Sequence, residues 1–459
     1  MNESPVLQRP LGILGVLRLG LVQTALGAIV VLTTSTINRV MAVELALPAL
    51  LPGLLVGLHY AVQMTRPRLG YGSDCGGRRT PWIIGGMAVL AVGGALAAVA
   101  TALTSTHTVA GIALAFLAFT LVGIGVGCAG TSLLVLLAKS VTPRYRGAAA
   151  TTVWVMMIVG FIVTTIVAGG QLDPFTFERL VIVTSTVSII AFVVACLAVW
   201  GIEKRHLGTS PAAGENVPES GASSVAAVPF KEALADVWSE AESRRFAIFV
   251  FVSMLAYSAQ DLILEPFAGA VFMMTPGEST QLSGTQHGGV LAGMLLVALC
   301  CSFFSGRLIG SLRFWTLSGC LASALVLSGL ATGGLLGERF PLVPAVFCLG
   351  IANGAFAVGA IGSMMDLVGR GAKQREGLRM GLWGAAQAIA FGLAGLLATL
   401  AVDAARLVLG DAALAYALVF FLQAAVFLLA AWLAQRVYAP AQPEAHGTFS
   451  VGRLAMGSE

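Results

Sequence analysis

Charged residues are scarce in this sequence. They make up 10% of its 459 residues, whereas 57% are hydrophobic, and the mean hydropathy is +0.90. A water-soluble domain carries about 25% charged residues. These values exclude a chain that folds with most of its surface in water, and we expect a protein whose solvent is a lipid bilayer.

Residues that build soluble-enzyme sites are also sparse or scattered. The seven cysteines show no spacing typical of a disulfide framework or a metal site, and the five histidines are dispersed along the chain. There is no Walker-type phosphate loop and no nucleophile elbow. The N-terminus lacks the ordered regions of a cleaved signal peptide, so we expect the first helix to be retained. We predict that the protein is not an enzyme.

Long apolar runs are abundant instead. A helix needs about 20 mostly apolar residues to cross roughly 30 Å of hydrocarbon, and twelve stretches meet this requirement. They are 17–38, 45–66, 82–104, 110–138, 147–169, 178–201, 246–270, 287–311, 313–335, 340–366, 379–402 and 412–436. We therefore predict an all-α membrane protein with 12 transmembrane helices.

Lysine and arginine indicate the orientation of these helices. If both termini are cytoplasmic, most of the 26 basic residues lie on the cytoplasmic side. The exceptions are Arg39, Arg179, Arg339 and Arg406. This asymmetry follows the positive-inside rule and predicts a multi-pass protein of a bacterial inner membrane with both termini in the cytoplasm. The net charge of +4 is thereby explained by topology, without a nucleic-acid partner.

One long polar segment divides the chain. We predict an N-terminal six-helix half at 1–201, a cytoplasmic linker at 202–245 and a C-terminal six-helix half at 246–436, followed by a disordered tail at 437–459. Part of the linker, 229–245, has the pattern of an amphipathic helix. It either lies on the membrane surface or docks a cytoplasmic partner.

The loop between the second and third predicted helices carries a specific motif, LGYGSDCGGRRTPW. Its spacing resembles the loop signature of the major facilitator superfamily. The matching positions are Gly70, Asp74, Gly77, Arg78 and Arg79. This resemblance implies two pseudo-symmetric six-helix halves, with a carboxylate that pairs with a basic residue to hold the cytoplasmic side closed.

Charged groups within the predicted helices are candidate functional residues because they are costly in lipid. Asp261 and Glu265 lie one turn apart on the seventh helix, while Arg39 and Glu44 lie at the end of the first. The first and seventh helices face each other in this fold, so we predict an intramembrane charge pair between Arg39 and Asp261. A proton relay is the alternative.

His59 of the second predicted helix is a different kind of candidate. A neutral imidazole can bind the magnesium of a chlorin, and the nearby Gly57 leaves room for a flat ring. The alternative is a histidine that is hydrogen-bonded within the bundle.

Three strings carry a closer resemblance: LRLGLVQTALGAIVVLTTSTINRVMAVELALPALLPGLLVGLHYAVQMTRP, GSDCGGRRTPWIIGG and AYSAQDLILEPFAGAVF. They are similar to the PucC/LhaA family of photosynthetic bacteria, also called the bacteriochlorophyll delivery family, and most similar to members encoded beside bacteriochlorophyll synthesis genes. The resemblance implies an assembly factor in the photosynthetic, intracytoplasmic membrane. It would bind bacteriochlorophyll or a precursor and deliver it to light-harvesting or reaction-centre subunits. Candidate pigment ligands are His59, Glu44 and Glu265.

Two other functions stay open. The first is a secondary transporter of a small solute, in which Asp261 or Glu265 takes up the proton. The second is a non-catalytic subunit that anchors pigment-synthesis enzymes through residues 229–245.

Overall fold

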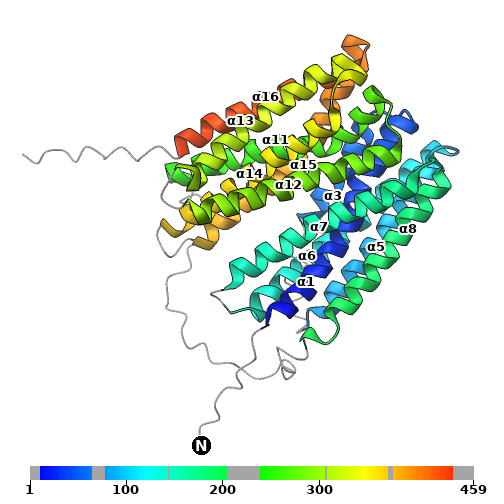
Figure 1. The fold of residues 1–459 in the computed structure, drawn as a ribbon. Helices are drawn as coiled ribbons and strands as arrows, with labels where there is room; N and C mark the ends of the chain where they lie inside the picture. The colour runs from blue at the N-terminus through cyan, green and yellow to red at the C-terminus, as the bar shows by residue number, and fades with distance from the viewer. Residues whose placement is uncertain are drawn as a thin grey trace, which may run out of the picture.

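The computed structural model describes residues 11–64, 78–142, 145–203, 238–304, 308–370 and 376–437. The described residues form helices and connecting turns (Figure 1). Most of the predicted linker, the predicted tail and three of the loop-motif residues (Gly70, Asp74 and Gly77) lie outside these ranges.

Six main helices make up each half of the chain. In the first half they are α1 (Ile13–Val31), α3 (Leu50–Gln63), α5 (Thr80–Thr104), α6 (Thr108–Ser140), α7 (Arg146–Leu172) and α8 (Phe177–Val199). In the second half they are α11 (Ala241–Phe272), α12 (Pro276–Phe303), α13 (Leu312–Leu336), α14 (Leu342–Arg370), α15 (Glu376–Leu409) and α16 (Ala412–Val437).

The helix that starts with α1 changes its winding before it ends. It continues through the π-helical turns η1 (Leu32–Thr36) and η2 (Val40–Glu44), with the short helix α2 (Ile37–Arg39) between them. Hydroxyl groups compete with the backbone here, because Thr33 donates to the Ile29 carbonyl and Thr34 to that of Val30. Such π-turns often occur at functional sites.

Hydropathy located the helices well. Within the described ranges, eleven helices are long and apolar enough to cross a membrane, which confirms a multi-pass membrane protein. The second predicted helix, 45–66, is shorter than expected, since α3 has 14 residues and rises only about 21 Å. Its first residues leave the helix because Ala46 has a φ of 48° and Pro48 lacks an amide hydrogen.

Helix neighbours repeat between the two halves. In the first half, α1 packs against α7 and α8, α5 against α6 and α8, and α3 against α6. The equivalent pairs in the second half are α11 with α15 and α16, α13 with α14 and α16, and α12 with α14. Between the halves, α7 contacts α12 and α15 contacts α3. The fifth helix of each half thus packs on the second helix of the other, as a pseudo-two-fold arrangement requires.

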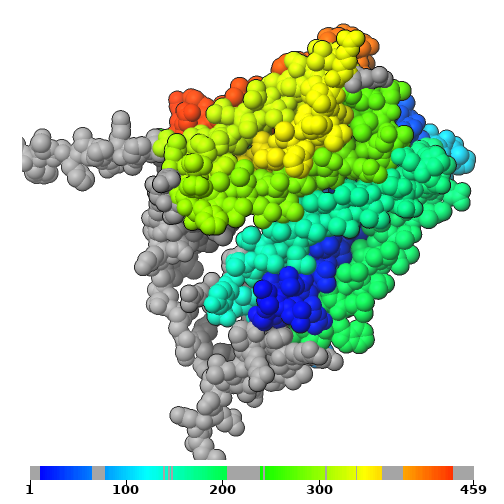
Figure 2. All heavy atoms as spheres, in the orientation of Figure 1, coloured from blue at the N-terminus to red at the C-terminus, as the bar shows by residue number. Residues whose placement is uncertain are grey.

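Large apolar side chains cover the outside of both halves. Leu, Ile, Val and Phe side chains are exposed along α7, α8, α12 and α16, as expected for surfaces that face lipid. The halves lie against each other along α7 and α12, and their outline is notched toward the end where α1 begins (Figure 2). We call the opposite end, which carries the turns at 45–49, 173–176 and 273–275, the cap end.

Candidate functional site

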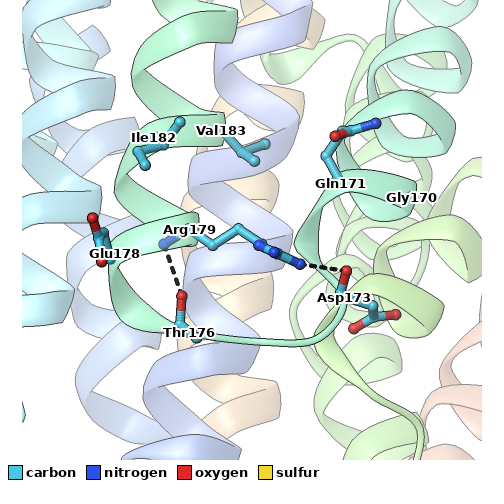
Figure 3. A pocket seen from close by; sticks show the side chains of 8 residues that line it. All are labelled: Gly170, Gln171, Asp173, Thr176, Glu178, Arg179, Ile182 and Val183. Carbon is cyan, nitrogen blue, oxygen red and sulfur yellow. Dashed lines mark hydrogen bonds between the residues drawn. The ribbon is translucent and has the colours of Figure 1, made fainter.

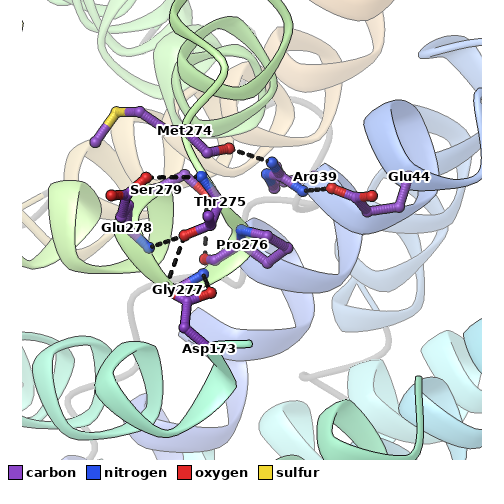
Figure 4. Close-up of polar contacts among 9 residues, drawn as sticks. All are labelled: Arg39, Glu44, Asp173, Met274, Thr275, Pro276, Gly277, Glu278 and Ser279. Carbon is purple, nitrogen blue, oxygen red and sulfur yellow. Dashed lines mark hydrogen bonds and ion pairs between the residues drawn. The ribbon is translucent and has the colours of Figure 1, made fainter. Parts of the chain in front are cut away.

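Arg39 is buried at the cap end, where it joins the two halves. Its Nη1 atom donates to Oε1 of Glu44 at 2.5 Å, and its Nη2 atom donates to the carbonyl oxygen of Met274 at 2.6 Å (Figure 4). Gly269 of α11 permits this approach, because a Cβ atom there would lie 2.8 Å from Nη2. The predicted pair between Arg39 and Asp261 is wrong: within the described ranges, the carboxylate that pairs with Arg39 belongs to Glu44.

The end of α11 explains why an arginine binds there. Met273 adopts a left-handed conformation with a φ of 56°, which ends the helix and leaves carbonyl groups without helical partners. The helix dipole makes this terminus negative, so a guanidinium is favoured. Arg39 therefore caps a helix of the other half while Glu44 balances its charge.

A row of polar side chains continues from Arg39 along the contact between the halves. The amide of Asn38 donates to the Leu262 carbonyl at 2.7 Å, and the hydroxyls of Thr36 and Thr280 lie 3.0 Å apart. Ser283 of α12 donates to Oε1 of Glu265 at 2.5 Å. We call Thr36, Asn38, Glu265, Thr280 and Ser283 the polar seam.

The two carboxylates of α11 differ in their surroundings. Glu265 is buried, and its Oε2 atom has no hydrogen-bond partner among the described residues. Asp261, one turn earlier, is partly exposed and forms no ion pair with any described residue. Both groups lie within the stretch Ser243–Phe272, which is long and apolar enough to cross a membrane.

His59 lies inside the bundle. Its side chain is 1% exposed, its Nε2 atom is 2.7 Å from Nε2 of Gln63, and its ring meets that of Tyr60 edge to face at 5.0 Å. A chlorin plate could reach this imidazole only if α3 and its neighbours moved. The arrangement matches the alternative interpretation, a histidine hydrogen-bonded within the bundle.

Two carboxylates that sequence reasoning passed over connect the halves. Asp173, just after α7, accepts from the Thr275 hydroxyl at 2.7 Å and from the Gly277 amide at 3.4 Å (Figure 4). Asp403 of α15 accepts from the amides of Ala49 and Leu50 at 2.9 and 2.7 Å. A carboxylate at the end of a predicted helix usually faces water. The signal that could have found them is their shared position, near the end of the fifth helix of each half.

A pocket of about 400 Å³ opens beside Asp173 (Figure 3). Its lining residues are Gly170, Gln171, Asp173, Thr176, Glu178, Arg179, Ile182 and Val183. Arg179 closes one wall by donating to the Asp173 carbonyl at 2.5 Å. Because polar and apolar groups share this lining about equally, the pocket differs from the apolar groove expected for a chlorin.

Only the end of the loop motif, Arg78 and Arg79, lies within the described ranges. The backbone amide of Arg79 donates to Oε1 of Glu203 at 2.6 Å, and that of Thr80 donates to Oε2 at 2.9 Å. Glu203 thereby supplies an acidic cap to the first turn of α5. The predicted role of the motif carboxylate, Asp74, stays a prediction.

Comparison with solved structures supports the fold. A peptide transporter POT is similar with a TM-score of 0.67 and 14% identity, covering 95% of this chain and 97% of that one. The nucleoside transporter NupG gives a TM-score of 0.64 and 13% identity, covering 93% and 100%. Together with the repeated helix neighbours, this confirms the predicted major facilitator fold.

Comparison with curated proteins gives closer relatives. The chain is 52% identical over 430 residues to the "Bacteriochlorophyll synthase 44.5 kDa chain" of Rhodobacter capsulatus, covering 94% of this chain and 96% of that protein. It is 31% identical over 395 residues to "Protein PucC" of Cereibacter sphaeroides, covering 82% and 81%. The family model described as "PUCC protein" matches residues 36–442. The chain belongs to the PUCC protein family.

Proposed function

We propose that this protein is a non-catalytic assembly factor that receives bacteriochlorophyll or a precursor and passes it to light-harvesting or reaction-centre polypeptides. The observation that carries the proposal is the family match over residues 36–442, together with the relative whose name refers to bacteriochlorophyll synthase. Its setting would be the intracytoplasmic photosynthetic membrane, with both termini in the cytoplasm.

Among the three candidate pigment ligands, the geometry favours Glu265. Glu44 already pairs with Arg39, and His59 is hydrogen-bonded within the bundle. Glu265 keeps one oxygen without a partner among the described residues, at the contact between the halves. A carboxylate oxygen is a hard ligand that suits magnesium. Pigment would therefore reach this group when the halves separate.

Purification from a pigmented host tests the proposal. The near-infrared spectrum of the purified protein should show bound bacteriochlorophyll, and the Glu265→Gln variant should lose most of it. The matched control is Glu278→Gln, since Glu278 caps the first turn of α12 at the cap end and takes no part in the polar seam. Equal pigment content in a folded Glu265→Gln variant would exclude Glu265 as the ligand, and a pigment-free wild-type protein would contradict the function.

Asp261 and Glu265 also support a second candidate function, a proton-coupled transporter of a small solute. Carboxylates inside a membrane protein often relay protons, and the fold is that of the transporters described above. Reconstitution into liposomes separates the two candidates. Solute uptake that follows an imposed proton gradient, in protein free of pigment, would favour transport.

The anchoring role stays a prediction, because most of segment 229–245 lies outside the described residues. Deleting its residues 229–240 should release pigment-synthesis enzymes from the membrane if the role is real. The bundle should remain folded, since this deletion ends before the helix α11 begins at Ala241.

A further inference from the structure

Asp173 and Asp403 occupy equivalent places in the two halves. Each lies toward the end of the fifth helix of its half, and each caps the start of the second helix of the other half. The recipient groups are the amides of Ala49 and Leu50 on one side, and Thr275 and Gly277 on the other. The caps therefore join the same helices that pack against each other between the halves, α7 with α12 and α15 with α3.

Glycine brings the paired helices close together on both sides. A Cβ atom on Gly53 of α3 would lie 2.1 Å from Oγ1 of Thr399 on α15. A Cβ atom on Gly169 of α7 would lie 2.7 Å from the carbonyl oxygen of Gly277 on α12. The carboxylates can therefore reach the opposite helix only while these contacts are closed.

Asp173 is unfavourably placed beside its own helix, because it follows the last turn of α7, where the helix dipole is negative and disfavours an anion. Asp403 lies within α15, which ends at Leu409. The first amides of α3 and α12 in turn lack helical acceptors. Closing the halves satisfies all of these groups at once, and parting them leaves all of them to water.

Arg39 adds a third link at the same end. It binds Met274, next to the Thr275 hydroxyl that Asp173 binds, so the turn between α11 and α12 is held from two elements of the first half (Figure 4). At the other end of the molecule the outline between the halves is notched (Figure 2).

We propose that Asp173 and Asp403 are a matched pair of latches that hold the cap end closed and release together, so that the protein moves between two states. This conformation is the one closed at the cap end, which is the periplasmic side in the orientation predicted from the sequence. The proposal concerns how the halves move, and it holds whether the cargo is a pigment or a soluble solute.

Spin-label distances in the full-length protein, reconstituted in lipid nanodiscs, test the latch. The seven native cysteines are replaced by alanine. One label pair, Thr106→Cys with Leu335→Cys, reports on the cap end, because both positions are exposed near the ends of α5 and α13. A second pair, Trp200→Cys with Phe303→Cys, reports on the other end, where both side chains are exposed.

The variant Asp173→Asn with Asp403→Asn should shift the cap-end distances to longer values and shorten those at the other end. The control is Asp411→Asn, because Asp411 caps the Leu414 amide of α16 within one half. The Asp411→Asn variant also loses a carboxylate cap on a backbone amide, but this cap does not join the halves. The variant should therefore keep the wild-type distances. Unchanged distances in the folded double variant, or equal shifts in the control, would overturn the latch.

Hydrogen exchange of the unaltered protein keeps the test independent of how the variants fold. Amides in the peptides 46–54 and 274–282 should become exposed in one concerted step, because both caps open when the halves part. The peptide around Leu414 should exchange separately. Unrelated opening rates for the first two peptides would show that the caps do not act as a pair.

Discussion

The guanidinium of Arg39 donates to the carbonyl oxygen of Met274 at 2.6 Å, joining the first helix of one half to the end of the first helix of the other. This bond and the ion pair with Glu44 engage both terminal nitrogens of a cation that is almost fully buried. The relationship explains how a positive charge is tolerated there, and it leads to the first two predictions.

Replacing Arg39 with methionine should lower the free energy of unfolding by about 3 kcal/mol, because Glu44 and the Met274 carbonyl lose their partner. Unfolding in detergent, followed by circular dichroism, measures the change. Arg18→Met is the matched control, since Arg18 is partly exposed and binds the Trp200 carbonyl at 2.6 Å within one half. The control should cost no more than about 1 kcal/mol. Equal losses of unfolding free energy in the two variants would mean that the burial of Arg39 adds nothing to stability.

A double-mutant cycle identifies the partner of Arg39. Combining Arg39→Met with Glu44→Gln should give a coupling energy of about 1 to 3 kcal/mol, as contacting residues do. The same cycle with Asp261→Asn should give a coupling below about 0.5 kcal/mol. A larger coupling energy with Asp261 than with Glu44 would support the pair between Arg39 and Asp261 that the sequence predicted.

Ser283→Ala should destabilise the protein by about 1 to 3 kcal/mol, because it leaves the buried Glu265 carboxyl without its hydrogen-bond donor. Ser279→Ala is the comparison, since Ser279 is also buried but bonds the Pro276 carbonyl of its own helix. Thermal unfolding of both variants in detergent gives the difference. A larger effect at Ser279 would contradict the importance of the polar seam.

Two glycines one turn apart on α3 should respond differently to alanine. Gly53→Ala places a methyl group against Thr399 and should cost about 1 to 3 kcal/mol. Gly57→Ala meets its nearest atom, the Gly392 carbonyl oxygen, at 3.7 Å, so its effect should stay within about 1 kcal/mol.

Removing the Thr399 side chain that the new methyl group meets completes the test of Gly53→Ala. Thr399→Ala in the Gly53→Ala background should recover most of the lost stability, because the clash is with the threonine side chain. Failure to recover it, measured by the same unfolding assay, would mean that the two helices do not pack as described.

The sequence predicted the fold well because hydropathy reports directly on which segments contact lipid. It placed the main helices, and Arg39, Asp261 and Glu265 lie within helices that are long and apolar enough to cross a membrane. The partner of Arg39 was missed because depth in the membrane does not determine the direction of a side chain, and the π-turns η1 and η2 change that direction locally.

The caps at Asp173 and Asp403 were missed for a different reason. Each bond joins residues more than 100 positions apart in the sequence, and neither end has an unusual local pattern. The relationship is a property of the tertiary structure, in which the fifth helix of each half, α7 or α15, reaches the start of the second helix of the other half. Glu203, which caps α5, lies past the last predicted helix of its half and gave no sequence signal either.

The exchanged caps also have the form of a contact between two symmetric copies. In a symmetric homodimer, a contact from residue i to residue j is always accompanied by the contact from j to i. Asp173 on α12 and Asp403 on α3 have this reciprocity within a single polypeptide. They are the kind of contact that two copies of a six-helix unit would make across a two-fold axis, here formed between the two halves of one chain.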